Sequence, residues 1–555
     1  MAVTGQTREW DYVIVGAGSA GSVLAERLSR DSGTRVLLVE AGGEANTSLV
    51  HMPKGIAKLV MDPNHIWAYQ IDQPRYHGSH TPEVWIRGRG LGGSSSINGM
   101  IWSRGESEDY DAWADLGCLG WNGTSMNAAF KAIEDNALGS SEIRGEGGPV
   151  RITPGTFRYP LTRKMIDAGK QMGLVEADDL NSVKGGRVGY YSHNIRRGRR
   201  DSGATAFINK ARRRPNFALL THTLACRAVF GNGRVTGVEL SQIERGRWIE
   251  KVRGEVIVCA GTIESPQFLE RSGIGDSAIL QAAGIPLIAH SPDVGNKMRE
   301  HLSFAMTYRL TKKIGIDHHY YGVGLALSLL RYYLTRTGAM ATGPFEVGAF
   351  ANVAHPDGRT DLQMYLGGYT FALSDDNHPV PLSDIDRKPG ISIYGQLLRL
   401  SSEGSIHVRS SKVNDRPEIK PNWLSTEYDR TAAIRTIRYM RKFMAQPALS
   451  DVLGAEVLPG DHVQSDEEIL EAFRRLSTSG LHGTGSCRMG GDARSVVDPA
   501  LRVRGVIGLR VADCSVMPTL VTGNTNAPAM ALGWRTADLI LAAQRHDSPA
   551  VSSSP

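Results

Sequence analysis

Residues 11–40 read DYVIVGAGSAGSVLAERLSRDSGTRVLLVE, and this stretch decides the fold. Tyr12 to Val15 is a short apolar, β-branched run, which is typical of a strand buried on both faces. Glycines follow in G-x-G-x-x-G spacing, and apolar residues then recur at helical intervals before a second strand ends at Glu40. A strand–turn–helix–strand unit with a terminal acid about 20 residues past the turn predicts a dinucleotide-binding site.

Each glycine of this turn has a physical role. Gly16 lets the chain turn sharply, Gly18 admits a pyrophosphate against bare backbone, and Gly21 lets the helix pack closely on the strand. We expect the Glu40 carboxylate to accept hydrogen bonds from a pair of ribose hydroxyls. Because an acid at this position repels a 2′-phosphate, the expected ligand is an ADP group without one.

Length, charge and cysteine usage restrict the class of protein. With 555 residues the chain should hold more than one core, and its net charge of +6 is small for that length. The arginine-rich run at 196–200 lacks the aromatic pattern of a nucleic-acid site, so we interpret it as a solvated face and expect no nucleic-acid partner. Five scattered cysteines and an N-terminus without a signal peptide predict a soluble cytoplasmic protein with reduced thiols. The longest apolar patch, at 323–330, is too short to span a bilayer.

The order of predicted elements indicates an α/β fold with two parts. After EVIVCAG, which reads as a strand, Ser265 is the expected N-cap and Pro266 the first position of a helix. From about Leu302 to Asp461, strand-like alternations separated by long loops suit a mainly antiparallel sheet with helices. These alternations span 304–309, 362–365, 391–398 and 405–408. A last buried strand and the helix 529–543 follow, so we expect the dinucleotide domain to be built from both ends of the chain.

Six stretches spread in order along the chain resemble the motifs of the glucose–methanol–choline (GMC) oxidoreductases, flavoenzymes that bind FAD and usually oxidise alcohols. They are DYVIVGAGSAG with Glu40, RGRGLGGSSSINGMIWSRG (87–105), GTIESPQFLERSGIG (261–275), VGNKMREH (294–301), HGTGSCRMG (482–490) and LRVADCSVMPTLVTGNTNAP (509–528). The resemblance implies a Rossmann-like FAD-binding domain and a substrate domain with a mainly antiparallel sheet and helices. The expected segments are 8–158, 196–301 and 465–545 for the FAD-binding domain, 159–195 and 302–464 for the substrate domain, and 546–555 for a disordered tail.

Carried over by position, the resemblance assigns cofactor-binding residues along these motifs. The expected FAD contacts are Gly16, Gly18, Ser19, Ala20, Gly21, Glu40, Ala41, Gly93, Ser94, Asn98, Gly99, Met100, Ile101, Ala225, Asp513, Cys514, Asn526, Ala527 and Pro528. Some family members attach the flavin covalently to a histidine near Asn98. Because Ile97 stands at that position here, the resemblance implies noncovalent FAD.

The resemblance also identifies two catalytic positions. His482 matches the family's catalytic histidine, and Asn524 matches the second position, where other members carry histidine or asparagine. A neutral imidazole is a natural acceptor for a hydroxyl proton, since its pKa lies near the working pH. An amide can donate a hydrogen bond to the substrate oxygen but cannot take a proton at neutral pH. We therefore expect His482 to act as general base and Asn524 to position the substrate.

Other candidate contacts are less specific. No metal-ligand spacing links the remaining histidines, so we expect no metal site. The histidines expected at the surface or in loops are His193, His222, His290, His378 and the doublet His318–His319. By resemblance Glu346 is a candidate substrate contact, with a structural salt bridge as the alternative. Residues 315–337 could form an apolar lid or rest weakly on a membrane surface.

These assignments predict FAD-dependent oxidation of a primary or secondary alcohol to the carbonyl, with hydride transfer to flavin N5. We favour a dehydrogenase that passes electrons to a quinone-like acceptor, and an oxidase that uses O2 and makes hydrogen peroxide is the close alternative. A non-redox lyase with the same fold, or a flavin-binding protein that has lost catalysis, are further alternatives. The sequence names neither the alcohol nor the acceptor.

Overall fold

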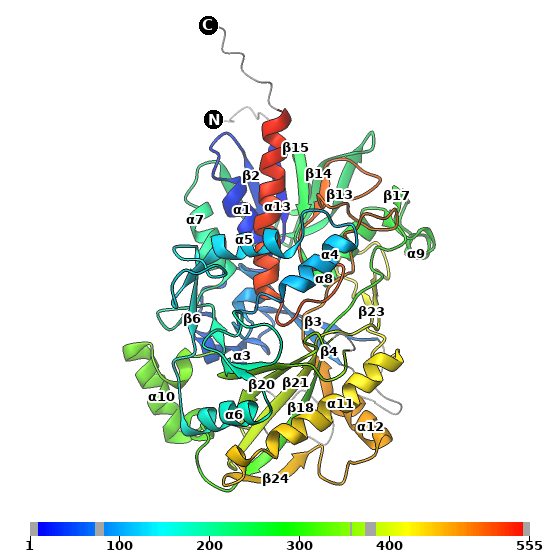
Figure 1. Ribbon diagram of the computed structural model, residues 1–555. Coiled ribbons are helices and arrows are strands. Elements are labelled where there is room, and N and C mark those ends of the chain that lie inside the picture. Colours follow the sequence, from blue (N-terminus) through cyan, green and yellow to red (C-terminus); the bar gives the residue numbers. More distant parts are fainter. Residues whose placement is uncertain (1–8, 73–82, 356–357, 372–383, 548–555) are drawn as a thin grey trace.

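The fold is organised around two large β-sheets, each with its own hydrophobic core. A computed structural model of the protein describes residues 9–72, 83–355, 358–371 and 384–547, arranged as Figure 1 shows. The sheet that contains the N-terminal strand lies in the upper half of this view, and the second sheet lies in the lower half. The described chain therefore starts and ends in the same half of the molecule.

The first sheet is parallel at its centre. Strands β12, β2, β1 and β15 are neighbours in that order, and β26 pairs with β15. The parallel strands are β12 (Phe217–Leu220), β2 (Val36–Val39), β1 (Trp10–Val15), the second half of β15 (Gly246–Val258) and β26 (Leu509–Val511). The first half of β15 pairs with β14 (Arg234–Gln242), and β14 pairs with β13 (Leu224–Gly231), both antiparallel. The predicted Rossmann-like core, built from both ends of the chain, is confirmed.

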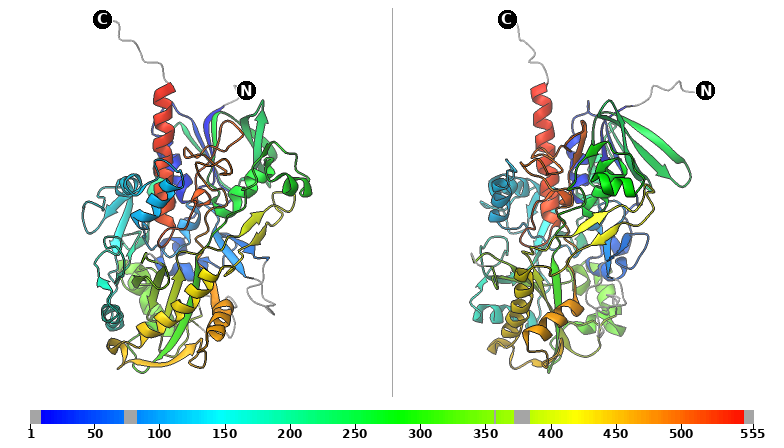
Figure 2. Two further views of the ribbon diagram at one scale, coloured as in Figure 1. Left: turned by 45° about the vertical axis from the view of Figure 1, so that its right-hand side comes forward. Right: turned by 90° about the vertical axis from the view of Figure 1, so that its right-hand side faces the viewer.

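Helix α1 (Ser19–Leu28) follows the glycine turn and packs against helix α13 (Asn526–Asp547). Gly16 adopts a left-handed φ of +99°, and a Cβ at Gly21 would lie 2.0 Å from the Gly16 carbonyl oxygen. A Cβ at Gly533 would approach the Ala20 carbonyl oxygen to 2.7 Å, so α13 crosses α1 with the two backbones in contact. Figure 2 shows the C-terminal helix, in red, beside the N-terminal segment, in blue, from two directions.

The second sheet is antiparallel except for its β7–β8 edge pair. Its order is β24-β18-β21-β20-β19-β8-β7, and β25 pairs with β18. The strands are β7 (Val175–Glu176), β8 (Arg187–Tyr190), β18 (Leu302–Leu310), β19 (Val347–Ala351), β20 (Leu362–Gly367), β21 (Gly390–Leu397), β24 (Leu453–Leu458) and β25 (Ser477–Ser479). The helices whose apolar side chains share its core are α6 (Pro160–Gln171), α11 (Glu427–Met444) and α12 (Asp466–Leu476). The predicted mainly antiparallel sheet with helices is thus confirmed.

The opposite face of this sheet is open to a cavity. Along β18, Phe304 and Met306 point into the core beneath the helices, whereas Ser303, Ala305 and Thr307 line the cavity. Side chains alternate between the two faces of a strand, so each strand serves core and cavity at once. Strands β20 and β21 contribute to the cavity wall in the same way.

Helix α8 (Gly261–Arg271) begins earlier than the sequence pattern indicates. Its N-cap is Ala260, so the prediction that Ser265 caps the helix and Pro266 opens it is wrong. Pro266 lies inside the helix and cannot donate to the Thr262 carbonyl. That carbonyl accepts a hydrogen bond from the Ser486 hydroxyl at 2.7 Å instead, which explains why the helix tolerates a proline there.

Two further expectations differ from the structure. The strand-like alternation at 405–408 forms β22 (Ser405–His407), which pairs with β23 (Glu418–Lys420) in a separate two-stranded sheet. Helix α13 continues to Asp547, so the tail expected at 546–555 begins within the helix, and its remainder lies outside the described residues.

All five cysteines are free thiols, as predicted.

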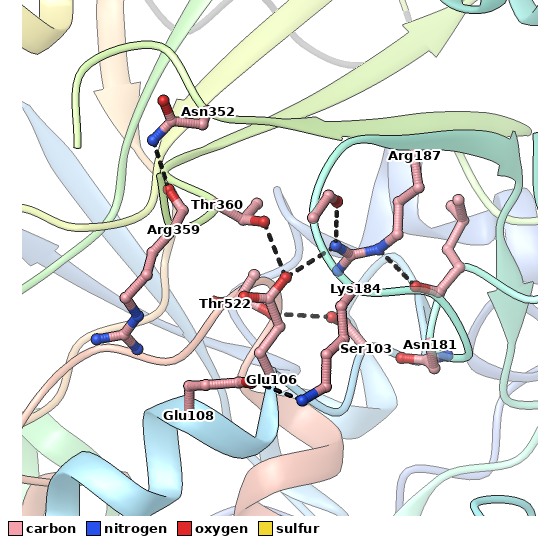
Figure 3. Close-up of polar contacts among 12 residues, drawn as sticks. Ser103, Glu106, Glu108, Asn181, Lys184, Arg187, Asn352, Arg359, Thr360 and Thr522 are labelled. Carbon is pink, nitrogen blue, oxygen red and sulfur yellow. Dashed lines mark hydrogen bonds and ion pairs between the residues drawn. The ribbon is translucent and has the colours of Figure 1, made fainter. Parts of the chain in front are cut away.

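A polar seam joins the N-terminal part of the chain to the second sheet (Figure 3). Glu106 accepts hydrogen bonds from Arg187 Nη1 of β8 and from the Thr360 hydroxyl, each at 2.8 Å. The Arg187 and Glu106 side chains are only 4% and 10% exposed, so neither charge can rely on water. The neighbouring Lys184–Glu108 pair lies in solvent instead, with those side chains 74% and 43% exposed.

We expect Glu106→Ala to lower the free energy of unfolding by about 3–5 kcal/mol, because it leaves the buried Arg187 guanidinium without its counter-ion. Glu108→Ala is the matched control and should cost at most about 1 kcal/mol, since Lys184 remains solvated. Urea-induced unfolding followed by circular dichroism measures both values. Equal losses of unfolding free energy in the two variants would contradict the expectation that the buried ion pair matters more than the exposed one.

Candidate active site

A cavity of about 1290 Å³ is lined by both sheets. Its first wall lies where the parallel strands end, at residues 15–16, 39–41 and 259–264, which is where open α/β sheets bind their ligands. Its second wall is the open face of the second sheet. The cavity exceeds the roughly 300–1,000 Å³ of an ordinary small-molecule pocket, and it therefore has room for a large cofactor together with a substrate.

The glycine turn presents bare backbone to this cavity. Gly18 lines it, and a Cβ there would meet only the Cys259 carbonyl oxygen, 3.9 Å away. Gly93 approaches the same turn so closely that its own Cβ would lie 2.8 Å from the Gly18 Cα. Ser19 and Ala20, at the start of α1, also line the cavity. A glycine cradle at a helix N-terminus suits a diphosphate group.

Glu40 directly follows β2 at the cavity wall and joins three backbone segments. Its Oε2 accepts from the Ala17 amide at 2.9 Å, and its Oε1 accepts from the Gly42 and Gly90 amides at 2.8 and 3.0 Å. Burial raises the pKa of this carboxyl, and the amide donors oppose that shift. The carboxylate therefore has a structural role at the turn, in addition to the ribose contact expected from the sequence.

Helix α13 begins at the cavity with an unpaired polar group. Asn526 Oδ1 accepts the Ser19 hydroxyl at 2.8 Å, whereas Asn526 Nδ2 is buried without a hydrogen-bond partner among the described residues. The positive end of the helix dipole lies at the same point. A buried donor without an acceptor is costly. The start of α13 is therefore suited to an anionic or acceptor-rich group in the cavity.

A buried arginine holds Asn98 at the wall. Arg200 Nη1 donates to the backbone and side-chain oxygens of Asn98 at 2.6 and 2.9 Å. Arg200 is only 2% exposed, and burial lowers its pKa to about 9. Its other acceptors are the carbonyl oxygens of Val50 and Ser95. The interpretation of the 196–200 run as a solvated face is therefore wrong for Arg200, which places a positive charge behind the 93–101 segment.

The structure brings most of the predicted cofactor residues to this one cavity. Those that line it are Gly16, Gly18, Ser19, Ala20, Glu40, Ala41, Gly93, Ser94, Asn98, Gly99, Met100, Ile101, Ala225, Asp513, Cys514 and Asn526. Gly21, Ala527 and Pro528 are not among the lining residues, since Gly21 packs on the Gly16 carbonyl and Ala527 lies in the core of the first sheet. Ile97 also lines the cavity.

His482 and Asn524 meet at the cavity wall. His482 Nε2 lies 3.2 Å from Asn524 Nδ2, and His482 Nδ1 lies 3.1 Å from His301 Nδ1. Because an amide nitrogen donates, His482 Nε2 is the acceptor and the imidazole proton is assigned to Nδ1. His301 Nδ1 then accepts the hydrogen bond from that proton. The basic atom of His482 is therefore Nε2.

Burial keeps both imidazoles neutral. It lowers the pKa of His301 to about 3 and, together with His301 and Arg87, lowers the pKa of His482 well below its ordinary value. Glu300 Oε1 accepts hydrogen bonds from the backbone N–H groups of His301 and His482. Burial raises the pKa of Glu300 to about 7, against the opposing effect of Arg87, whose Nη2 lies 3.3 Å from Glu300 Oε2. A titratable carboxyl thus lies directly behind a neutral base.

Sequence reasoning missed the residues that hold this pair. Asn524 Oδ1 accepts from Gln363 Nε2 at 3.1 Å, and Asn524 Nδ2 lies 3.2 Å from the Tyr365 hydroxyl oxygen. Gln396 Nε2 lies 3.2 Å from His301 Nδ1. His301 ends the VGNKMREH motif, which is the signal that could have identified it. The only sequence signal for Gln363, Tyr365 and Gln396 is the alternation of side chains along β20 and β21, which places them on the sheet face that bears the cavity.

Glu346 lies behind the cavity wall, and Lys54 lies in it. Lys54 Nζ is 3.2 Å from Glu346 Oε1, and the Tyr159 hydroxyl donates to Glu346 Oε2 at 3.1 Å. The side chains of Lys54 and Glu346 are 8% and 0% exposed. The structural salt bridge, which was the alternative expectation for Glu346, is present.

Helix α10 (Gly322–Thr335), labelled in Figure 1, forms from the apolar segment at 315–337. It borders the cavity. Leu325 and Leu329 line the cavity, whereas Val323, Leu327 and Leu334 are exposed. One helix thus supplies cavity wall and an apolar outer face. Across the described residues, no helix combines the length and apolar character needed to cross a membrane.

Within the described parts of the chain, no group of three or more histidine, cysteine or acidic side chains is placed to hold a metal ion. The expected surface or loop position of His193 is wrong, because it is buried in β9 (Ser192–His193), where burial lowers its pKa to about 4. His378 lies outside the described residues.

Comparisons with known proteins agree with this arrangement. Two models of the GMC oxidoreductase family match residues 10–303 and 401–533. An oxygen-dependent choline dehydrogenase of Pseudomonas putida is 34% identical over 540 residues, 96% of this chain and 94% of the relative. An alcohol dehydrogenase [acceptor] of Pseudomonas putida is 35% identical over 541 residues, 96% of each chain. The solved pyridoxine 4-oxidase from Mesorbium loti superposes with a TM-score of 0.85 at 30% identity, covering 97% of this chain and 100% of that one. The chain therefore belongs to the GMC oxidoreductase family and is an enzyme that acts on CH–OH donors.

Proposed function

We propose that this enzyme uses noncovalent FAD to oxidise a primary or secondary alcohol to the carbonyl compound and passes the electrons to a quinone-like acceptor. The observation that carries the proposal is the contact of His482 Nε2 with Asn524 Nδ2 at the wall of a cavity large enough for FAD and substrate. The names of the two curated relatives refer to choline and to an alcohol, which supports an alcohol as the substrate class.

Family membership implies FAD, and the cavity residues fit it. Gly18 and the start of α1 would hold the diphosphate, and Glu40 would face the adenosine ribose. The buried, unpaired Nδ2 of Asn526 would donate to an acceptor on the cofactor. When bound, the flavin supplies the hydride acceptor for the alcohol carbon. The apolar side chain of Ile97 supports noncovalent attachment, because it cannot form the bond that a histidine makes in some relatives.

His482 takes the hydroxyl proton in this proposal. Its Nε2 lone pair accepts the proton, while Nδ1–H continues to donate to His301, so the imidazolium keeps a hydrogen-bond acceptor. Asn524 Nδ2 turns from Nε2 to the alcohol oxygen and aligns the hydroxyl with the base. Gln363 donates a hydrogen bond to Asn524 Oδ1, and the Tyr365 hydroxyl oxygen accepts one from Asn524 Nδ2. The Asn524 amide therefore cannot flip without losing both contacts.

We also propose the division into an FAD-binding domain (8–158, 196–301 and 465–545) and a substrate domain (159–195 and 302–464). Strand β8, from the first substrate segment, pairs within the second sheet, and β13 to β15, from the middle FAD-binding segment, belong to the first sheet. Strand β25 crosses this division, because it lies in the last FAD-binding segment and pairs with β18.

Anaerobic mixing with a panel of primary and secondary alcohols tests the reaction class. At least one alcohol should bleach the oxidised flavin band, and a quinone should then restore the colour faster than air does. Rapid recolouring in air would favour the oxidase instead. An unchanged band with every alcohol would favour a lyase or an inactive flavoprotein.

We expect His482→Ala to retain FAD but to slow flavin reduction by at least ~10²-fold, because the variant lacks the proton acceptor. Stopped-flow absorbance under anaerobic conditions measures the rate. His290→Ala removes an exposed imidazole of β17 (Ala289–His290) and is the matched control, which should react at the wild-type rate. A His482 variant that reduces at nearly the wild-type rate would remove this residue from the mechanism.

The rate of flavin reduction should fall as the pH drops through about 7, the raised pKa of Glu300. Above that pH the carboxylate is ionised, and its negative charge stabilises the imidazolium that forms on His482. In Glu300→Gln the fall in rate near pH 7 should disappear from the pH–rate profile. The lowered pKa of His482 keeps its imidazole neutral at pH values well below 6.5. An acid limb near 6.5 in both proteins would assign the titration to His482 and contradict this interpretation.

Acid precipitation tests how the cofactor is attached. We expect all flavin to remain in the supernatant after the protein is precipitated with trichloroacetic acid, because Ile97 offers no group for a covalent bond. Absorbance of the supernatant and pellet measures the distribution. Flavin that stays with the washed pellet would show a covalent link through another residue.

A further inference from the structure

An aromatic wall leads from the catalytic pair to a buried cation. The Tyr365 ring, whose hydroxyl contacts Asn524, lies 5.3 Å from the Phe345 ring. The carbonyl oxygen of the preceding residue, Pro344, accepts a hydrogen bond from Lys54 Nζ at 3.3 Å. All five residues line the cavity that contains His482. The Lys54 ammonium therefore borders the space that is open to the body of a substrate.

This ammonium occupies an aromatic cage. Lys54 Nζ lies 5.4 Å from the ring centroid of Tyr320 and 5.4 Å from that of Tyr369. The two rings stand edge to face, with their centroids 5.0 Å apart, and both line the cavity. Cages of aromatic rings are the sites at which proteins bind quaternary ammonium ligands. Here the chain's own cation fills the position that a ligand cation would take.

The Glu346 carboxylate, which lies behind the cage, already has hydrogen-bond partners. Glu346 pairs with Lys54 and accepts the Tyr159 hydroxyl, and it does not line the cavity. A cationic ligand would thus meet the ammonium before it met the acid. To reach Glu346 it would have to displace Lys54 and leave a buried charge without its partner.

We propose that Lys54 restricts the enzyme to alcohols that carry no positive charge, by filling the cage and neutralising Glu346. The inference rests on the proposed alcohol oxidation and names its substrate class. The rest of the wall near the cage suits an uncharged apolar or aromatic body. Its apolar members are Met52, Leu325, Leu329, Met340 and Phe345.

Two alcohols of the same shape test the charge alone. Choline and 3,3-dimethylbutan-1-ol differ only in a quaternary nitrogen in place of a quaternary carbon. We expect the holoenzyme to reduce its flavin with the uncharged alcohol at a kcat/KM at least ~10-fold above that for choline, because like charges repel in the buried cage. Equal values, or a preference for choline, would overturn the proposal.

Three variants separate charge from shape. Lys54→Met keeps an unbranched stem but frees Glu346, and it should move the ratio toward choline by at least ~10-fold. Glu346→Gln removes the acid but leaves the Lys54 side chain in the cage, so the ratio should not move toward choline. Lys54→Met combined with Glu346→Gln changes the shape without leaving a charge, and its ratio should fall between those of the wild type and Lys54→Met. A ratio that Lys54→Met leaves unchanged would contradict the role of Lys54.

Measuring alcohol binding to the slow His482→Ala variant distinguishes failure of this inference from failure of the proposed oxidation. The dissociation constants of both alcohols for oxidised His482→Ala enzyme can be read from changes in the flavin spectrum before the slow reduction proceeds. Tighter binding of the uncharged alcohol supports the inference even if no alcohol bleaches the wild-type flavin. Equal or reversed affinities, or no binding of the uncharged alcohol, would overturn it independently of catalysis.

Discussion

The contact between α1 and α13 is the constraint on which the site depends. Because Gly533 has no side chain, the backbone of the C-terminal helix lies directly on Ala20, at the first turn of the N-terminal helix. The start of α13 is thereby held at the glycine turn, where Asn526 bonds Ser19 across 507 positions of sequence. The loop before α13 carries Asn524 to strand β20 in the interior of the second sheet. The glycine turn and the Asn524 amide are therefore positioned by the same helix crossing.

What the sequence could predict follows from how local each signal is. The turn at Gly16–Gly21 could be predicted because it is local and each of its glycines is required for a separate steric reason. The parallel core could be predicted from the buried apolar runs that form its strands. Residues that matter through distant partners were missed or misread. Arg200 belongs to a basic run, and only its bonds to Asn98 reveal that it is buried. Lys54 and Gln396 carry no local signal, because their roles depend on which loop or strand faces them. The early start of α8 is visible only once Ser486 is seen to satisfy the Thr262 carbonyl.

Burial disfavours the charged form of both histidines. The fall in the pKa of His301 from 6.5 to about 3 corresponds to roughly 5 kcal/mol against its charged form. His301 therefore stays neutral and serves as the acceptor for the His482 Nδ1–H. The same burial makes His482 a weak base, and Arg87 weakens it further. Glu300, held by the backbone of both histidines, is the negative group that opposes this effect when it is ionised.

The Lys54–Glu346 pair is hard to explain by stability alone. A buried ion pair loses so much hydration that apolar residues of similar volume are often neutral or stabilising replacements. This pair also stands at a cavity wall, where apolar side chains already surround it. Its position has a consequence for the proposed chemistry, because every unpaired positive charge in the cavity disfavours the imidazolium that the proposed mechanism forms on His482. Glu346 removes that effect for Lys54, and an uncharged substrate avoids adding it again. Selection of a neutral alcohol and operation of a buried neutral base are thus two results of the same electrostatic balance.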